Sequence, residues 1–329
     1  MGQNHALVLR QLGFSLISVA DPIEVARTQV IERWQGDCLP ASFSNIENLL
    51  KFQKPDLLVI ATTAEGHSSQ ALQAIEGGVR LILLEKPVAT SLAGCQQLRL
   101  ACEGTGAHIA VNHQRRFLPQ YLITKELLIS PAYGGFKSMH VAAGNFGMAM
   151  NGTHYFEAFR FLSDEAPTEV SAKFDLESLP NPRGSQFKDV SGSILITTAS
   201  GRRLYIDASA DQGHGVQVTY MARQGRITID ELTGSMTTVV RTAEHRIAPT
   251  TRYGLPVVIQ QQKIPPVELV DSTKAVLVAL LAGEGYPTLA DATLAVKTLV
   301  AAYHSHRLEG KPVKLASISD GDTEVFPWA

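Results

Sequence analysis

The stretch Leu81–Thr90, LILLEKPVAT, decides how the first part of this chain is interpreted. Its four aliphatic residues are typical of a strand buried on both faces, yet they run directly into an acid, a base and a proline. A buried strand has room for charge only where it leaves the sheet, because an unpaired buried charge is costly. In a parallel sheet, ligands bind at the carboxyl ends of the strands. Glu85 and Lys86 are therefore candidates for a binding edge, or alternatively for a strand-end salt bridge.

The residues around this stretch alternate apolar strand candidates with helical patterns. Continuous apolar runs separated by helices indicate a parallel sheet that is covered on both faces. The expected strands span residues 14–21, 56–63, 81–85 and 108–112, and the expected helices span 21–34, 68–78 and 91–106. We therefore predict an α/β domain over residues 1–112, with a Rossmann-like doubly wound parallel sheet.

A different pattern begins after residue 112. Several segments alternate polar and apolar residues, as Leu204, Ile206 and Ala208 do against their neighbours, and turns containing glycine join several of them. Such alternation is typical of an antiparallel sheet with one face on helices and the other face open. A long helical pattern near the end of the chain stops at Gly310, a common helix terminator. We predict an α+β domain over residues 113–329 that binds substrate and mediates oligomerisation.

Composition excludes several classes of protein. Of the 329 residues 45% are hydrophobic and 18% are charged, and the net charge is −2, with no basic tract for a nucleic-acid backbone. The longest apolar runs fall short of the roughly 20 residues that a membrane span needs. The three cysteines are odd in number and lack metal-ligand spacing, which favours reduced thiols. We expect a cytoplasmic protein without a metal site, a nucleic-acid partner or a membrane segment.

The start of the chain fits part of a dinucleotide-binding unit. Such a unit has a strand, a Gly-x-Gly-x-x-Gly turn and a helix, with an acid about 20 residues further on. Gly2 and Asp21 match the third glycine and that acid, with a helical pattern between them. The first strand and the first two glycines are then missing, and we expect that the start codon was assigned late. The alternative is a natural protein that binds a dinucleotide poorly.

Several motifs in order resemble the Gfo/Idh/MocA family of nicotinamide-dependent oxidoreductases, which act mostly on sugars, sugar derivatives and cyclitols. The resemblance covers nearly the whole chain, and its motifs are Glu-Lys-Pro at 85–87, RRFLP at 115–119, NGTHYFEAFRFL at 151–162 and the closing helix with GKPVKL at 310–315. The sequence departs from the family at Met150, where the usual aspartate four residues before His154 is absent and Asn151 lies beside it. Glu157 conservatively replaces a second aspartate.

The resemblance implies an NAD(P)-dependent dehydrogenase or reductase in which Lys86 meets both the nicotinamide and the reacting hydroxyl. Removing a hydride from an alcohol carbon requires the hydroxyl proton to leave, so a base or a cation must contact that oxygen. It also implies that His154, near the start of a helix, hydrogen-bonds a substrate hydroxyl or relays its proton. Without the motif, a single histidine is more often structural.

The resemblance also implies further binding residues. Asp21 would accept hydrogen bonds from the ribose hydroxyls, which favours NAD over NADP, or it is a turn residue before Pro22. The cofactor-binding candidates are Gly2, Asp21, Thr62, Thr63, His67, Glu85, Lys86 and Gln114, although His67 is alternatively a helix cap. The substrate-binding candidates are Lys86, Arg116, Asn151 and His154. Arg115 and Arg116 equally fit interdomain ion pairs, and Asn112 is a weaker candidate.

Two other functions stay open. An NAD-dependent glycosidase of the same family would use a transient oxidation, and a non-catalytic sugar-binding or scaffold protein would keep the fold with a degraded cofactor site. We expect self-association as a homo-dimer or tetramer through the open face of the second domain's sheet. The loop at 177–189, ESLPNPRGSQFKD, carries no chemistry that can be recognised from the sequence.

Overall fold

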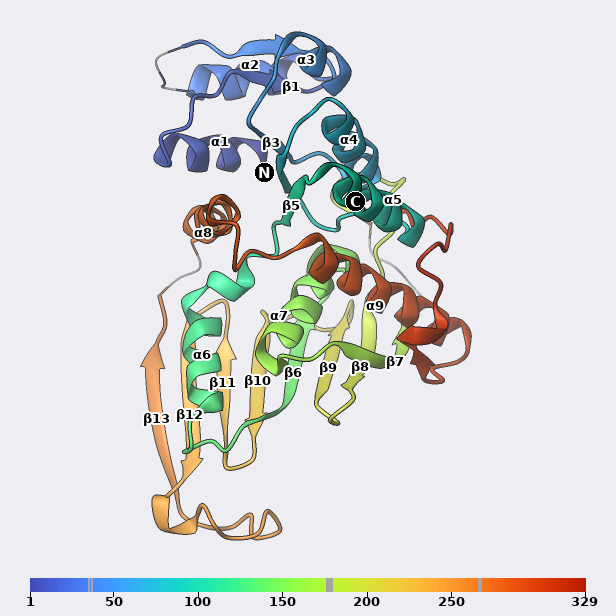
Figure 1. The fold of residues 1–329 in the computed structure, drawn as a ribbon. Helices are drawn as coiled ribbons and strands as arrows, with labels where there is room; N and C mark the ends of the chain where they lie inside the picture. Colours follow the sequence, from blue (N-terminus) through green and yellow to red (C-terminus); the bar gives the residue numbers. More distant parts are fainter. Residues whose placement is uncertain (35, 37, 176–179, 266–267) are drawn as a thin grey trace. The chain divides into compact units, whose positions relative to one another are not determined.

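The computed structural model describes residues 1–34, 36, 38–175, 180–265 and 268–329, and these form two units (Figure 1). Unit 1 comprises Met1–Gln114, Glu268–Val296 and Asp320–Trp328. Unit 2 comprises Arg115–Val267, Lys297–Ser319 and Ala329. Two later segments of the chain pack with the N-terminal region in unit 1, and a single division at residue 112 does not include them.

Unit 1 alternates helices and short parallel strands. In the described ranges, the strands form two separate sheets, β1–β2 and β3–β4–β5, and all of their pairings are parallel. The elements are α1 (Gly2–Gln11), β1 (Ser18–Ala20), α2 (Glu24–Arg33), β2 (Ala41–Phe43), α3 (Ile46–Phe52), β3 (Leu57–Ile60), α4 (Ala64–Glu76), β4 (Leu81–Leu84), α5 (Leu92–Thr105) and β5 (His108–Val111). This is the predicted Rossmann-like arrangement of parallel strands and helices.

The middle strand of the three-stranded sheet is the most deeply buried. Ile82, Leu83 and Leu84 of β4 have no exposed surface, and β4 pairs with β3 on one side and with β5 on the other. An aliphatic run buried on both faces is what a parallel sheet between helices requires. The prediction from LILL is confirmed, and the polar residues after it emerge at the carboxyl edge of this sheet.

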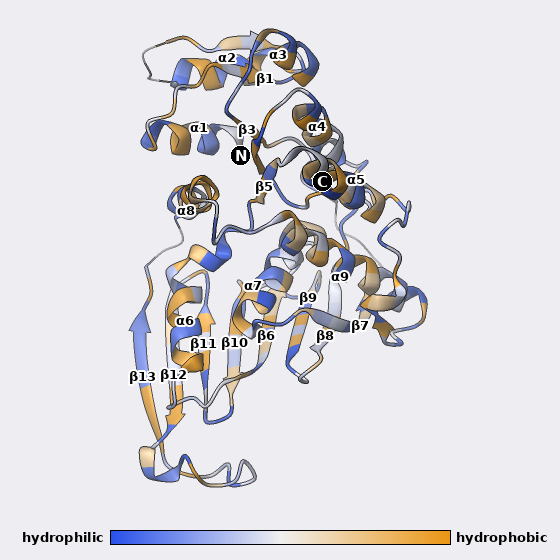
Figure 2. Ribbon diagram, in the orientation of Figure 1, coloured by the Kyte–Doolittle hydropathy of each residue, from blue (hydrophilic) through white to orange (hydrophobic). Residues whose placement is uncertain are grey.

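A late segment of the chain completes unit 1. Helix α8 (Leu269–Ala282) packs against α1 and β5, and most of its length is hydrophobic (Figure 2). The chain then returns to the sheet, where the N–H of Val111 donates to the carbonyl of Pro287 at 2.9 Å. These contacts join residues more than 150 positions apart, so their pairing could not be predicted from local patterns.

Unit 2 is built on a large, mostly antiparallel sheet. Among the described residues it has nine strands in the order β13-β12-β11-β10-β6-β9-β8-β7-β14, and only β6 and β9 pair in parallel. The strands are β6 (Phe136–Gly144), β7 (Pro167–Phe174), β8 (Gly192–Thr198), β9 (Arg203–Ser209), β10 (Gln217–Ala222), β11 (Gly225–Asp230), β12 (Ser235–Arg241), β13 (Val257–Lys263) and β14 (Val313–Lys314).

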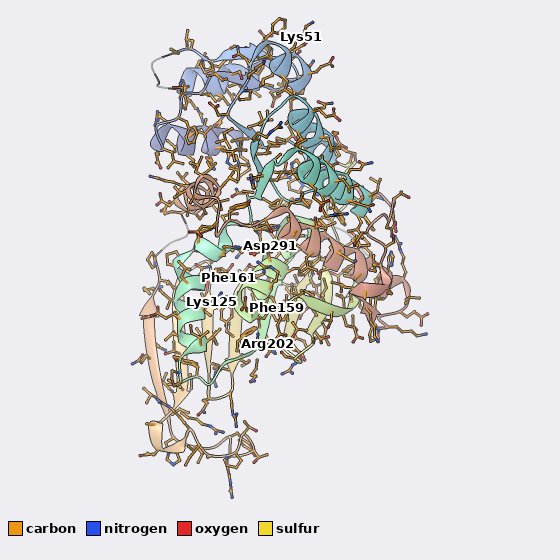
Figure 3. All side chains as sticks on the ribbon, in the orientation of Figure 1. Lys51, Lys125, Phe159, Phe161, Arg202 and Asp291 are labelled. Atoms are coloured by element: carbon orange, nitrogen blue, oxygen red, sulfur yellow. The ribbon has the colours of Figure 1, made fainter. Side chains whose placement is uncertain are left out.

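Helices cover one face of this sheet. They are α6 (Pro119–Ile129), α7 (Thr153–Ser163) and the later part of α9 (Leu289–Arg307), which lie in front of the strands in Figure 1. Phe159 of α7 points to the sheet, where its ring contacts that of Phe136 in an edge-to-face pair with centroids 5.9 Å apart (Figure 3). The alternation of buried and exposed residues along β9 therefore places Leu204 and Ile206 against the helices.

The opposite face of the sheet is open, as the sequence predicts. It forms a hollow of about 820 Å³ across β6–β10, whose lining includes His140, Lys173, Leu195, Tyr205, Asp207 and Thr219. None of the described helices is long and apolar enough to cross a membrane. Within the same residues, no group of three or more His, Cys, Asp or Glu side chains is arranged to hold a metal ion.

Candidate functional site

Glu85 is the centre of a buried polar cluster at the end of β4. One carboxylate oxygen, Oε1, accepts hydrogen bonds from His5 Nε2 at 2.9 Å and from Asn112 Nδ2 at 2.8 Å. The other oxygen, Oε2, accepts a hydrogen bond from the backbone N–H of Lys86 at 3.3 Å. These partners come from α1, from the end of β5 and from the next residue, so the cluster joins three segments at one edge of the sheet.

This cluster keeps Glu85 ionised. Burial by itself raises the pKa of the carboxyl, but the hydrogen bonds from His5 and Asn112, with the charges of His5 and Lys86, outweigh it and lower the pKa to about 2. A buried acid paired in this way carries a fixed negative charge beside Lys86. The imidazole of His5 is the side chain paired with Glu85, and the adjacent charge of Lys86 also lowers the pKa of the carboxyl.

His67 links the Glu-Lys-Pro turn to the loop after β3. Its ring is buried, with Nδ1 2.7 Å from the carbonyl oxygen of Pro87 and Nε2 3.1 Å from that of Thr62. Burial lowers the pKa of His67, so the ring is neutral and donates to one of the two carbonyls. The ring of His67 does not cap a helix, which was the alternative from the sequence. It holds the loop at Thr62 against the turn that follows Lys86.

The remaining candidates of unit 1 lie at the carboxyl ends of its strands or at the start of α1. Thr62 follows β3, with its hydroxyl donating to Gln70 Oε1 at 3.0 Å, and Thr63 directly precedes α4. Lys86 follows β4, is partly buried, and joins Pro87 through a cis peptide bond. Gly2 is the first residue of α1.

A nicotinamide dinucleotide, which this fold implies, fits two features of unit 1. Asp21 directly follows β1, and its Oδ1 accepts the N–H of Ile23 at 2.8 Å, whereas its Oδ2 accepts no hydrogen bond from the described residues. Gln114 is buried, and its Oε1 has no hydrogen-bond partner in the described part of the chain. A buried polar atom without a partner calls for a ligand, and a strand-end carboxylate suits ribose hydroxyls.

In unit 2, His154 lies in the first turn of α7 and is buried. A turn of π-helix, η2 (Met148–Gly152), leads directly into α7 and carries Met150 and Asn151. Asn151 donates from Nδ2 to the carbonyl oxygen of Phe146 at 2.6 Å. The predicted direct role of Asn151 toward substrate therefore competes with a local backbone contact.

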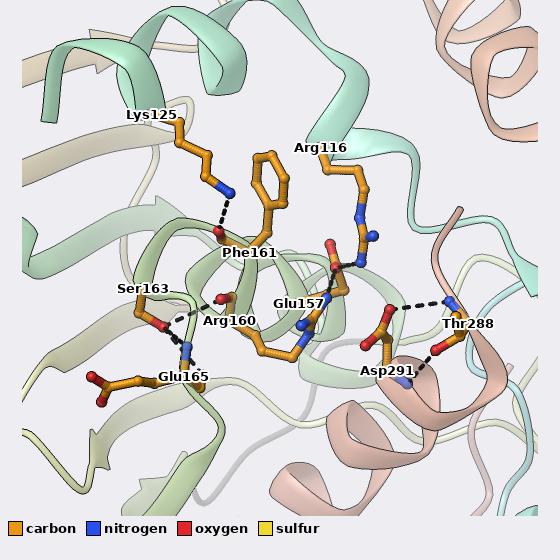
Figure 4. Close-up of polar contacts among 9 residues, drawn as sticks. All are labelled: Arg116, Lys125, Glu157, Arg160, Phe161, Ser163, Glu165, Thr288 and Asp291. Carbon is orange, nitrogen blue, oxygen red and sulfur yellow. Dashed lines mark hydrogen bonds and ion pairs between the residues drawn. The ribbon is translucent and has the colours of Figure 1, made fainter. Parts of the chain in front are cut away.

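Arg116 belongs to a buried ionic group with Glu157 and Arg160. Glu157 has almost no exposed surface, and its Oε1 pairs with Arg116 Nη2 and, at 3.3 Å, with Arg160 Nη2 (Figure 4). Lys125 of α6 approaches α7 beside this group, donating to the carbonyl of Phe161 at 3.0 Å. The ion pair of Arg116 with Glu157 therefore lies within unit 2, whereas the sequence suggested an interdomain pair, and the predicted substrate contact of Arg116 stays a prediction.

Arg115 takes part in a second buried group, centred on Glu231 after β11. Nη1 of Arg115 lies 3.0 and 2.9 Å from the two carboxylate oxygens, and the hydroxyls of Tyr121 and Tyr155 donate to Glu231 at 2.8 and 2.7 Å. Burial opposes the charge on Glu231, but Arg115 outweighs it and the pKa of the carboxyl is lowered. Tyr155 is the residue after His154, so this group fixes the start of α7 to the sheet.

Sequence reasoning missed several of these partners. His5 lies three and four residues before the buried Val8 and Leu9, so the helical period of α1 could have identified it as an inward-facing histidine. Glu231 gave no comparable signal, because its partners are more than 70 positions away. Asp189, which ends the loop set aside as unreadable, bonds to η2; residues 177–179 of that loop lie outside the described part of the chain.

The parallel strands and helices of unit 1 define a Rossmann-like domain, and the comparisons with known proteins identify the class of protein that carries it. Residues 1–113 match the family model described as "Oxidoreductase family, NAD-binding Rossmann fold" for GFO_IDH_MocA. The NAD(+)-dependent scyllo-inositol 2-dehydrogenase of Bacillus subtilis is 26% identical, over 96% of this chain and 93% of that protein. The first third of the chain therefore matches the NAD-binding Rossmann domain of the Gfo/Idh/MocA family.

Solved structures share the fold over most of their length. An oxidoreductase from Agrobacterium radiobacter, in complex with NAD+, L-tartaric acid and magnesium, has a TM-score of 0.78 at 17% identity and covers 96% of each chain. A transcriptional regulator, Gal80p, from Kluyveromyces lactis has a TM-score of 0.77 at 12% identity, over 96% of this chain and 88% of that one. The fold alone therefore does not distinguish an enzyme from a regulator, and the function has to be inferred from the residues of the site.

Proposed function

We propose that this protein is an NAD-dependent dehydrogenase or reductase that transfers a hydride at a secondary alcohol of a sugar, a sugar derivative or a cyclitol. The observation that carries the proposal is the position of Lys86, which follows the central strand β4 and lies beside the ionised Glu85, itself held by hydrogen bonds from His5 and Asn112. Ligands of open α/β sheets bind outside this edge. The inositol dehydrogenase relative supports a polyhydroxylated ring as substrate.

Each named residue has a defined task in this mechanism. When bound, the oxidised nicotinamide supplies the hydride acceptor. Lys86 takes the proton of the reacting hydroxyl as a neutral amine, or stabilises the alkoxide as an ammonium, and the negative charge of Glu85 favours the ammonium form. His154 hydrogen-bonds a substrate hydroxyl or relays its proton. Asp21 binds the ribose hydroxyls, and its charge favours NAD over NADP.

Substitution of Lys86 tests the proposal. We expect Lys86→Ala to reduce turnover of an inositol with NAD by about 100-fold or more, because a general base contributes that much. Binding of NADH, followed by its fluorescence, should stay largely intact. Lys51→Ala, at an exposed lysine of α3, is the control and should keep wild-type turnover. Unchanged turnover in Lys86→Ala would remove this residue from the mechanism.

The two alternatives give different results. A glycosidase would release the phenol of an aryl glycoside with catalytic NAD and without net reduction. A non-catalytic protein that has lost its cofactor site would show no change in melting temperature with NAD or NADH. A ligand that binds only the folded state raises that temperature, so a clear upward shift would exclude the second alternative.

We also propose that the protein is cytoplasmic and self-associates through the open face of the sheet in unit 2. The free thiols of Cys38, Cys95 and Cys102 support a reducing compartment. The hollow on the open face supports self-association, because Lys173 and Asp207 both line it and a two-fold axis can place each opposite the other.

A further inference from the structure

The turn that leads into the helix of His154 is built on a carboxylate from a distant loop. Asp189 Oδ1 accepts the N–H of Ala149 at 2.8 Å, and Oδ2 accepts the N–H of Met150 at 2.8 Å. The N–H of Met148 donates to the carbonyl oxygen of Val190, also at 2.8 Å. The first three N–H groups of η2 thus all bond to residues 189–190. Such groups have no partner within their own helix, so the loop supplies what the element lacks.

The close approach of this carboxylate depends on a glycine. Gly147 has a φ of +70°, and a Cβ atom built on it would lie 2.2 Å from Asp189 Oδ2. No other residue leaves room for the carboxylate, and the left-handed conformation also favours glycine. The N–H groups of Asn151 and Gly152 both donate to the carbonyl of Gly147, at 2.9 and 3.2 Å, which closes the π-helical turn.

The loop that carries Asp189 is itself anchored. The N–H of Asp175 donates to the carbonyl of Ser191 at 2.9 Å, and the hydroxyl of Ser191 donates back to Asp175 Oδ2 at 2.8 Å. The hydroxyl of Ser209 on β9 donates to the same oxygen at 2.9 Å. The loop that carries Asp189 is therefore bound to the sheet, and the hydrogen bonds of Asp189 fix η2 relative to that sheet.

We propose that Asp189 is a positioning residue for His154, because its carboxylate binds the backbone N–H groups of Ala149 and Met150 in the turn that leads into α7. A π-helical turn has a different pitch from an α-helix, so the contacts that fix η2 also set the rotation of the first turn of α7. His154 lies in that first turn, four residues after Met150. The proposal rests on the proposed function only for its activity readout.

The test compares Asp189→Asn and Asp189→Ala with wild type. Asparagine keeps one acceptor oxygen and places an amide group against the other N–H, and alanine removes both acceptors. With inositol and NAD, we expect kcat to fall about tenfold or more in Asp189→Asn and further in Asp189→Ala, with a smaller change in KM, because proton handling depends on orientation. NADH binding should be unchanged. Asp164→Asn, at the left-handed residue that ends α7, is the matched control and should keep wild-type kcat.

A second readout does not depend on turnover. The ring ¹⁵N signals of His154, assigned by comparison with His154→Gln, should shift in Asp189→Asn and stay unchanged in Asp164→Asn. If wild type turns over no polyol while these signals shift, the proposed function fails and the positioning role stands. If Asp189→Asn lowers only the melting temperature, with His154 signals and kcat as in wild type, the positioning role is overturned. Should Asp189→Asn not fold, Gly147→Ala, which displaces the same carboxylate, is measured in its place with the same expected shifts.

Discussion

At the scale of single residues, Glu85 makes a direct prediction about acid stability. Its pKa is about 2 in the folded protein and near 4.5 in the unfolded chain, so its ionised form stabilises the fold above pH 4.5. This contribution is lost as the pH falls from 4.5 towards 2, and a shift of this size corresponds to about 3 kcal/mol. We expect Glu85→Gln to unfold more easily at neutral pH and to show a flatter loss of stability between pH 4.5 and 2.

The measurement is the free energy of unfolding in urea at several pH values. Glu103→Gln removes an exposed acid of α5, whose pair with Arg99 is more than half exposed, and serves as the control. The control should follow the wild-type pH dependence, because exposed pairs contribute little. An identical slope in Glu85→Gln and wild type would show that Glu85 does not carry this dependence.

The sequence predicted that Glu85 and Lys86 stand at a strand end, and it could do so because the signal is local. Four aliphatic residues followed by charges place the end of a buried strand without any knowledge of its neighbours. The partners His5 and Asn112 lie 80 and 27 positions away, and no local period connects them to Glu85. The hydrogen-bond partners of Glu85 could therefore be identified only from the folded structure.

At the scale of elements, α7 is held by contacts that differ in kind along its length. The loop at Asp189 fixes the turn before it, Tyr155 bonds to Glu231, and Glu157 pairs with Arg116 and Arg160. The helix itself was predictable from its amphipathic pattern, whereas β2 and α3 were missed; they are three and seven residues long, and β2 lacks the longer apolar run that residues 14–20 provide at β1. Short elements offer too few periods to separate them from loops.

The ionic group on α7 predicts a large loss of stability when its acid is neutralised. Glu157→Gln leaves two guanidinium groups beside a neutral amide, with Arg116 and Glu157 both buried. Breaking a buried pair by changing one partner leaves an uncompensated charge, so we expect a loss of about 3 kcal/mol in unfolding free energy. Urea unfolding measures it, and the exposed pair in Glu103→Gln should lose less than about 1 kcal/mol. Equal losses in the two variants would contradict the ionic role of Glu157.

At the scale of the whole molecule, the sheets of unit 1 and the large sheet of unit 2 differ in how their faces are used. The strands of unit 1 lie between helices, so their apolar runs are continuous, and the large sheet of unit 2 has helices on one face only. Alternation in the sequence predicted this difference. It could not predict the hollow, because the depth of an open face depends on the twist and stagger of strands that are distant in the sequence.

Self-association through that open face is the last prediction. Tyr205 lies in the hollow, where its ring contacts that of His140 at a tilt of 44° with centroids 4.6 Å apart, and it remains 37% exposed. An aspartate at this position would put an unpaired charge at the centre of the proposed interface. In an isologous dimer each subunit contributes the same surface, so the substitution places this charge in the interface twice. We expect wild type to be a dimer or tetramer by light scattering and Tyr205→Asp to dissociate. Tyr253→Asp, in a loop where the side chain is 95% exposed, should keep the wild-type mass, and a monomeric wild type would refute the interface.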